Sequence, residues 1–134
     1  MRIVLDTNVF ISGVFFGGLP FQILRAWRDG KVTLALSIEI LEEYQRVGRT
    51  LAKKFPGVDL DPILDLVAVS AEVVSAPDLP EPVCEDPEDD KFLACALAVR
   101  SKHIVSGDRH LLNVSPYRGV QILSPRAFVE RYLS

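Results

Sequence analysis

Short apolar runs alternate with segments of helical periodicity along this chain, and that alternation limits the folds it can adopt. Strands are predicted at RIVLD (2–6), KVTLAL (31–36), AEVVSA (71–76), HIVSG (103–107) and VQIL (120–123). Strands that alternate with helices form βαβ units, in which the sheet is mainly parallel and both of its faces are covered. The sequence therefore predicts an α/β fold with a five-stranded, mainly parallel sheet.

Helix boundary signals separate these runs. Gly17 and Gly18 are a helix stop, and Ser37 suits the N-cap of the helix IEILEEYQRV. The remaining predicted helix starts are Pro20 before FQILRAWRD, the cap Asp61-Pro62 before ILDLVAVS, the cap Asp86 with Pro87 for a helix from about residue 87, and Ser124-Pro125 before RAFVERYL.

Size and composition indicate a single domain over residues 1–134. Of the 134 residues, 49% are hydrophobic and 25% are charged, which is typical of a globular chain. No apolar run approaches the ~18 residues of a membrane span. The apolar run before Asp6 is only three residues long, too short for a signal peptide, so we expect a cytoplasmic protein without a membrane partner. Cys84 and Cys95 are expected to be buried hydrophobes.

Two acids stand at the carboxyl ends of predicted strands. Asp6 ends the first strand, and Asp108 follows HIVSG. Ligands of open α/β sheets bind beyond the carboxyl ends of the strands, so both side chains are candidates for a functional site.

The segment VCEDPEDDKFLACALAVR (83–100) adds a group of acids at a helix start. Capping and the helix dipole account for Asp86, Glu88 and Asp89. Asp90 is predicted to lie one turn inside this helix, beside apolar residues, where a carboxylate needs either a cation or hydrogen bonds. On the helix after the second strand, Glu43 borders the apolar stripe. Glu42, one residue earlier, is the alternative candidate for the same site position.

Together these acids indicate a metal site. Four carboxylates at one sheet edge repel each other unless divalent cations neutralise them, and all-oxygen ligation favours Mg²⁺ or Mn²⁺. Such ions support in-line phosphoryl displacement, which makes metal-dependent phosphodiester chemistry a plausible function. Whether one or two ions bind stays open.

Four motifs, in this order, resemble PIN-domain ribonucleases, and most closely the toxins of toxin–antitoxin pairs: VLDTNVFISG, SIEILEEYQRV, DPEDDKFLACALA and IVSGDRHLL. The resemblance implies a three-layer α/β/α sandwich and Mg²⁺- or Mn²⁺-dependent cleavage of single-stranded RNA. It implies that the metal ligands and catalytic acids are Asp6, Glu43, Asp90 and Asp108. Asn8 and Ser106 would support them, and Asp86 and Asp89 would bind metal through water.

The net charge of the chain is −3, and the residues other than the four site acids carry a net charge of +1. Candidate RNA contacts are Arg109 and His110, beside Asp108, and Arg46 and Arg49, on the Glu43 helix. The resemblance also implies an antitoxin partner, and the apolar segment VFISGVFFGGLPF predicts a homodimer interface.

Other functions compete with this one. An RNA-processing nuclease outside a toxin pair and a catalytically silent RNA- or protein-binding module both stay open. An aspartyl phosphatase needs Asp-x-Asp after the first strand, but Asn8 occupies the second position. A phosphorelay receiver needs an acceptor aspartate after the third strand, and SAPDLPEP offers no comparable site.

Overall fold

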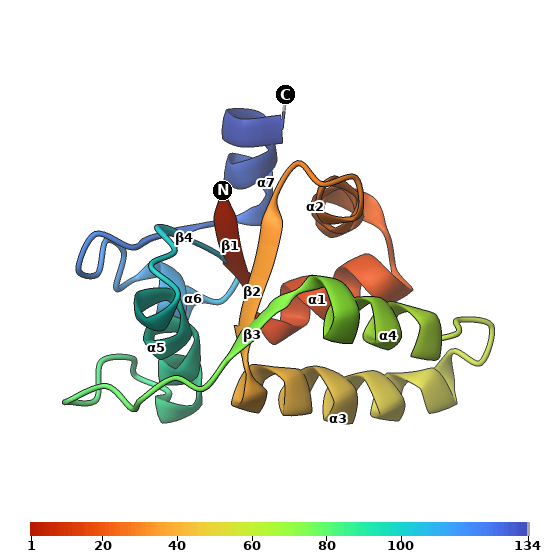
Figure 1. The fold of residues 1–134 in the computed structure, drawn as a ribbon, viewed down its shortest axis with the longest axis horizontal. Helices are drawn as coiled ribbons and strands as arrows, with labels where there is room; N and C mark the ends of the chain where they lie inside the picture. Colours follow the sequence, from red (N-terminus) through yellow and green to blue (C-terminus); the bar gives the residue numbers. More distant parts are fainter. Residues whose placement is uncertain (134) are drawn as a thin grey trace.

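A parallel sheet forms the centre of the molecule. The computed structural model describes residues 1–133. The strands are β1 (Arg2–Leu5), β2 (Thr33–Ser37), β3 (Glu72–Val74), β4 (His103–Val105) and β5 (Gln121–Leu123). They lie in the order β3-β2-β1-β4-β5, and each neighbouring pair is parallel (Figure 1). The predicted α/β class and five-stranded parallel sheet are confirmed.

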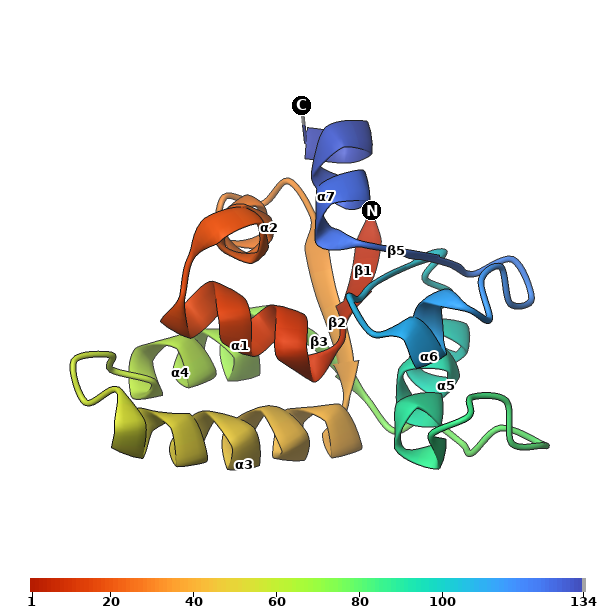
Figure 2. The same cartoon turned by 180° about the vertical axis from the view of Figure 1, so that it is seen from behind.

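Helices cover the sheet from both sides. Helix α5 (Asp90–Ala98) packs against β1, β2 and β4. Figures 1 and 2 show α5 and α6 on one side of β1 and β2, with α1, α2 and α4 on the other. The other helices are α1 (Thr7–Phe15), α2 (Gly18–Arg28), α3 (Ile38–Lys54), α4 (Asp61–Ser70), α6 (Arg109–Leu112) and α7 (Pro125–Phe128), followed by the π-turn η2 (Val129–Leu133).

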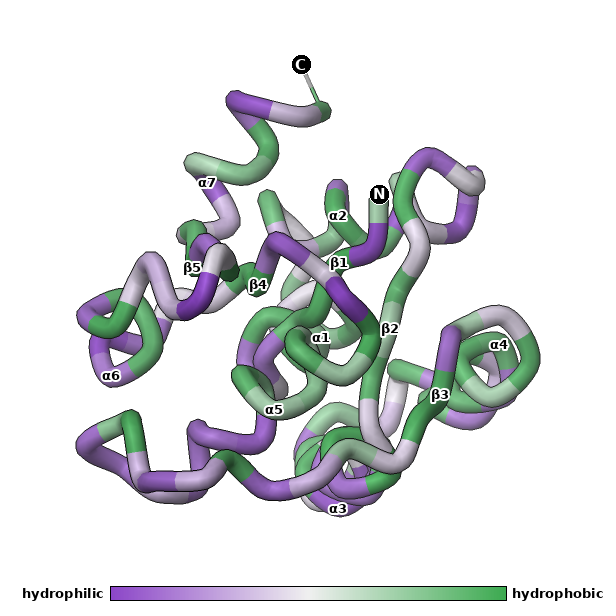
Figure 3. The backbone as a smooth tube through the Cα atoms, turned by 60° about the vertical axis from the view of Figure 1, so that its left-hand side comes forward, coloured by the Kyte–Doolittle hydropathy of each residue, from purple (hydrophilic) through white to green (hydrophobic). Residues whose placement is uncertain are grey.

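The central strands are buried over their apolar residues. Ile3, Val4 and Leu5 of β1 have no exposed surface, and neither do Leu34 and Leu36 of β2. A strand buried on both faces has no polar alternation, so these runs could be identified from sequence. In Figure 3 the hydrophobic colouring runs along β2 and through α5.

Capping serines begin two helices at the predicted positions. Ser37 Oγ accepts a hydrogen bond from the Ile40 N–H at 3.2 Å, and Ser124 Oγ accepts one from the Ala127 N–H at 3.1 Å. The predicted cap at Asp61 is wrong: this residue is already the first of α4, and the N-cap residue is Leu60, which makes no side-chain cap. The Asp61 N–H donates a hydrogen bond to the Asp59 carboxylate at 3.3 Å.

The start predicted at Asp86-Pro87 divides into two elements. Asp86 accepts a hydrogen bond from the Glu88 N–H at 3.0 Å, but it opens only a 3₁₀ turn, η1 (Pro87–Asp89). The α-helix α5 begins at Asp90. This short turn decides which acid faces the sheet edge.

Tyr44 joins α3 to the end of β1. Its buried hydroxyl donates to the Leu5 carbonyl at 2.5 Å, and its ring stacks on Phe10 of α1 with centroids 4.1 Å apart. The bond reaches the backbone just before Asp6, so α3 is fixed beside the carboxyl end of β1.

Within residues 1–133, no helix alone has the length and apolar content to cross a membrane, although α1 and α2 meet that test as a pair bent by 93°.

Candidate metal centre

Asp6 lies at the carboxyl end of β1 and is 3% exposed. One carboxylate oxygen caps α1 by accepting the Val9 N–H at 2.8 Å, and the other accepts the Ser106 hydroxyl. Burial raises the pKa of Asp6, although these two hydrogen bonds oppose the rise. The charges of Asp108 and Glu43 raise the pKa of Asp6 further, so both carboxylates lie close enough to Asp6 to interact with it electrostatically.

The loop after β4 brings Asp108 to the same place. The Ser106 hydroxyl accepts the Asp108 N–H at 2.9 Å while donating to Asp6, so one buried serine connects the two acids. Asp108 in turn caps α6 by accepting the His110 N–H at 2.8 Å. Adjacent parallel strands β1 and β4 thus present Asp6 and Asp108 at one edge.

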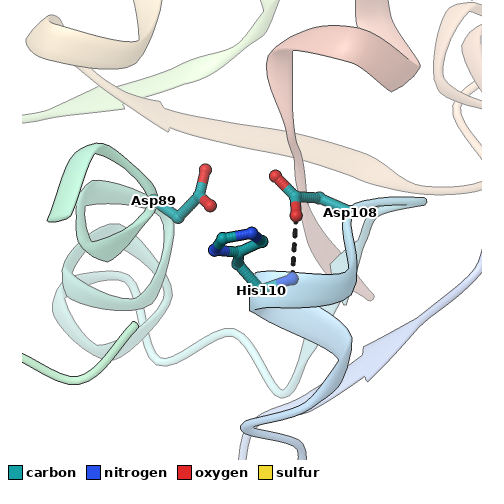
Figure 4. A group of neighbouring side chains, drawn as sticks. All are labelled: Asp89, Asp108 and His110. Atoms are coloured by element: carbon teal, nitrogen blue, oxygen red, sulfur yellow. Dashed lines mark hydrogen bonds between the residues drawn. The ribbon is translucent and has the colours of Figure 1, made fainter. Parts of the chain in front are cut away.

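Asp89 and His110 complete this group (Figure 4). A carboxylate oxygen of Asp89, one of Asp108 and a ring nitrogen of His110 all lie within 4.8 Å of one another. Burial and the charge of Asp108 raise the pKa of Asp89 to about 7, and His110 partly offsets that rise. Within the described chain, Asp89 Oδ2 and His110 Nδ1 are buried without a hydrogen-bond partner.

These unsatisfied atoms fit a divalent cation. A buried polar atom without a partner costs roughly 1–3 kcal/mol, and crowded carboxylates add repulsion. A cation held by Asp89, Asp108 and His110 removes both costs, with Asp6 alongside. The donor set, with carboxylates in the majority, suits hard or borderline divalent ions.

Glu43 has a different environment. It accepts the Thr7 hydroxyl and forms an ion pair with Lys91, whose side chain is only 11% exposed. Arg46 lies 3.9 Å from the same carboxylate. Burial alone lowers the pKa of Lys91, but the contacts with Glu43 and Glu88 outweigh it and raise that pKa. The protein itself therefore neutralises the Glu43 charge.

Comparison with known families bears directly on this site. The family model described as a PIN domain matches residues 2–110. The chain belongs to the PIN domain family. No curated protein and no solved structure matches it significantly. PIN domains are generally nucleases that use divalent metal ions, so nuclease chemistry and a metal site agree with the geometry.

Asp90 of this PIN domain points elsewhere. Its Oδ1 accepts the Cys84 N–H at 2.7 Å, and its Oδ2 accepts the Val83 N–H at 3.1 Å. Both oxygens thus hold the loop that leads into α5. Among residues 1–133, the structure groups Asp89 and Asp108 with His110 and connects Asp108 to Asp6 through Ser106, and Asp90 is not a member of that group.

The other predicted residues lie around the site. Glu43 borders it, whereas Glu42 is exposed. Asn8 and Arg109 are exposed, and Asp86 caps η1 and adds to the raised pKa of Asp89. Arg49 is turned toward Asp61, 3.6 Å away. Sequence reasoning did not single out Thr7 or Lys91, because neither contact follows from sequence spacing.

Proposed function

We propose that this PIN domain is a divalent-metal-dependent ribonuclease that hydrolyses phosphodiester bonds within single-stranded RNA. The observation that carries the proposal is the buried, unpartnered oxygen of Asp89, facing Asp108 at the carboxyl edge of the sheet. A buried carboxylate oxygen held there without a partner is costly for folding, and a bound cation would offset that cost.

Each side chain has a distinct part. Asp89 and Asp108 would hold a divalent cation near Asp6, which Ser106 fixes in orientation. Such an ion would supply positive charge to stabilise the charge that develops on a phosphodiester during in-line displacement. Lys91 keeps the Glu43 carboxylate beside this group without leaving its charge unbalanced.

RNA would approach over exposed basic side chains. Arg46 and Arg109 lie on elements that border the acids and are exposed, so each has access to phosphates. Arg49 is also exposed, although its ion pair with Asp61 competes for its charge. Their contribution should therefore depend on ionic strength.

We further propose that the protein is the toxin of a toxin–antitoxin pair. The family and the sequence motifs support a toxin whose antitoxin inserts a basic side chain among the acids. An RNA-processing nuclease outside a toxin pair and a silent binding module stay as alternatives. The cytoplasmic location stays a prediction.

The test is a cleavage assay on purified protein with single-stranded RNA, and with duplex RNA and single-stranded DNA as comparisons. We expect cleavage of single-stranded RNA with Mg²⁺ or Mn²⁺ and none with chelator. Asp89→Asn should lose at least about 100-fold in rate, since altering even a supporting residue of a metal site costs 10–100-fold.

Asp90→Asn is the matched control, because it changes the neighbouring aspartate in the same way. The geometry predicts that it retains most activity, whereas the sequence motif assigned the catalytic role to Asp90. If Asp90→Asn is inactive and Asp89→Asn is active, the proposed site is wrong. If the parent cleaves no nucleic acid with either metal, the silent binding module gains support.

A further inference from the structure

His110 is one of two histidines in the chain, and the two have different environments. The Nε2 of His103 has a hydrogen-bond partner, the Tyr132 hydroxyl, at 3.0 Å. The His110 ring projects between Asp89 and Asp108 in Figure 4, and its Nδ1 is buried without a partner. Such a nitrogen is a potential ligand, since neutral imidazole is the commonest side-chain metal donor.

A second observation comes from a different element. Asp89, at the end of η1, is 9% exposed, and its Oδ2 is also unpartnered. It faces the same space as the His110 ring in Figure 4. Two unsatisfied polar atoms from separate elements therefore face one point, which indicates a ligand between them.

The spacing suits a shared cation better than direct contact. Within residues 1–133, the His110 ring forms no ion pair or hydrogen bond with either carboxylate, yet the three candidate ligand atoms lie within 4.8 Å of one another. Ligands about 2.1–2.2 Å from one ion lie roughly 3–4.3 Å apart. Sub-ångström shifts of the side chains would bring the three candidate ligand atoms within that range.

A nitrogen donor changes which ion is favoured. Mg²⁺ is a hard ion that takes oxygen ligands and retains water, whereas first-row transition ions accept imidazole readily. Carboxylates suit both Mg²⁺ and Mn²⁺, and an added nitrogen donor favours the transition ion of the two, which is Mn²⁺. We propose that His110 is a nitrogen ligand of the cation and that it makes this site select Mn²⁺ over Mg²⁺. The inference rests on the metal-dependent function proposed above.

Pulsed electron paramagnetic resonance on the Mn²⁺-loaded protein tests the ligand directly. We expect modulation from one directly bound ¹⁴N nucleus, and its replacement by a ¹⁵N signal when the protein is made with ¹⁵N-histidine. The signal should disappear in His110→Asp and persist in His103→Gln, which changes the other histidine. Labelling makes the result independent of whether a variant folds.

Competition between Mn²⁺ and Mg²⁺, followed by calorimetry, tests the selectivity. We expect Mn²⁺ to bind the parent at least about tenfold more tightly, and His110→Asp to reduce that ratio severalfold by restoring an all-oxygen site. His103→Gln should keep the parent ratio.

The outcomes separate this inference from the function on which it rests. Mn²⁺ binding and RNA cleavage without a nitrogen signal would overturn the role of His110 and leave the nuclease proposal intact. A nitrogen signal that survives in His110→Asp would also overturn it. No binding of either metal and no cleavage would overturn the proposed function itself.

Discussion

Asp89 carries a pKa raised to about 7, far above the ordinary aspartate value of 3.8. The folded protein therefore holds this proton more tightly than the unfolded chain does. Its stabilising contribution is fully present below pH 3.8 and is lost as the pH rises through 7. We expect the metal-free parent to lose about 1–2 kcal/mol of stability through this group between pH 5 and 8, after allowing for solvent screening.

Asp89→Asn isolates this effect, because all other titrating groups stay the same. In the presence of chelator the variant should match the parent near pH 5 and melt a few degrees higher near pH 8. Saturating Mn²⁺ should reverse that order, since binding stabilises only the parent. If the variant and the parent have equal melting temperatures at both pH values, Asp89 is solvated and its charge costs no stability.

Lys91 is the second residue with a specific energetic role, as the internal counter-charge of Glu43. Lys91→Met should destabilise the protein by about 1–3 kcal/mol, because it leaves a largely buried carboxylate unbalanced. Adding Glu43→Gln to that variant should recover much of the loss. Urea unfolding of the two single variants and the double variant measures the coupling. If the stability losses of the two single variants add up to that of the double variant, the ion pair contributes nothing to stability.

Helix α5 and the loop before it form a unit held by Asp90. This carboxylate accepts the N–H groups of Val83 and Cys84. Asp90→Ala leaves both donors without their acceptor, and we expect a loss of about 1–3 kcal/mol with faster hydrogen exchange at those two amides. Glu85→Ala, at an exposed position in the same loop, is the control and should change neither. Unaltered exchange in Asp90→Ala would show that the loop is held by other contacts.

The start of α5 also marks the limit of prediction from sequence. Asp86-Pro87 fits the start of an α-helix, and only the folded chain shows that a 3₁₀ turn precedes Asp90. A shift of one residue rotates a helical side chain by about 100°, which separates the surroundings of Asp89 from those of Asp90. The sequence indicated that Asp90 needs a cation or hydrogen bonds, and the structure supplies the hydrogen bonds.

Strand ends were more predictable than helix starts. Continuous apolar runs identified β1 and β4, and their carboxyl ends then placed Asp6 and Asp108 at one edge. The family assignment followed from motif order and is confirmed by the match over residues 2–110. Lys91 could not be found in this way, because a lysine in an acidic stretch ordinarily indicates a solvated surface.

The whole molecule exposes an aromatic surface at the junction of α1 and α2, where the sequence predicts a homodimer interface. Phe16 is 61% exposed and lies edge-on to Phe55, with ring centroids 5.2 Å apart. Phe21 is 43% exposed on the adjoining turn of α2. Exposed aromatic side chains of this kind commonly mark a partner surface.

Light scattering across a range of concentrations tests the dimer. We expect a mass that approaches twice that of the chain for the parent and the monomer mass for Phe16→Ser. Val69→Ser, at an 85% exposed valine of α4, should behave as the parent. A monomer mass for the parent at every concentration would contradict the prediction.

Asp6 and Asp108 each begin a helix as well as lining the site, since Asp6 caps α1 and Asp108 caps α6. Alanine at either position therefore removes a cap worth about 1 kcal/mol together with a carboxylate. Asparagine caps a helix as well as aspartate does, so it removes the charge and keeps the cap. An inactive form of this protein intended to trap uncut RNA should carry asparagine at these positions, because alanine would make a folding defect indistinguishable from a catalytic one.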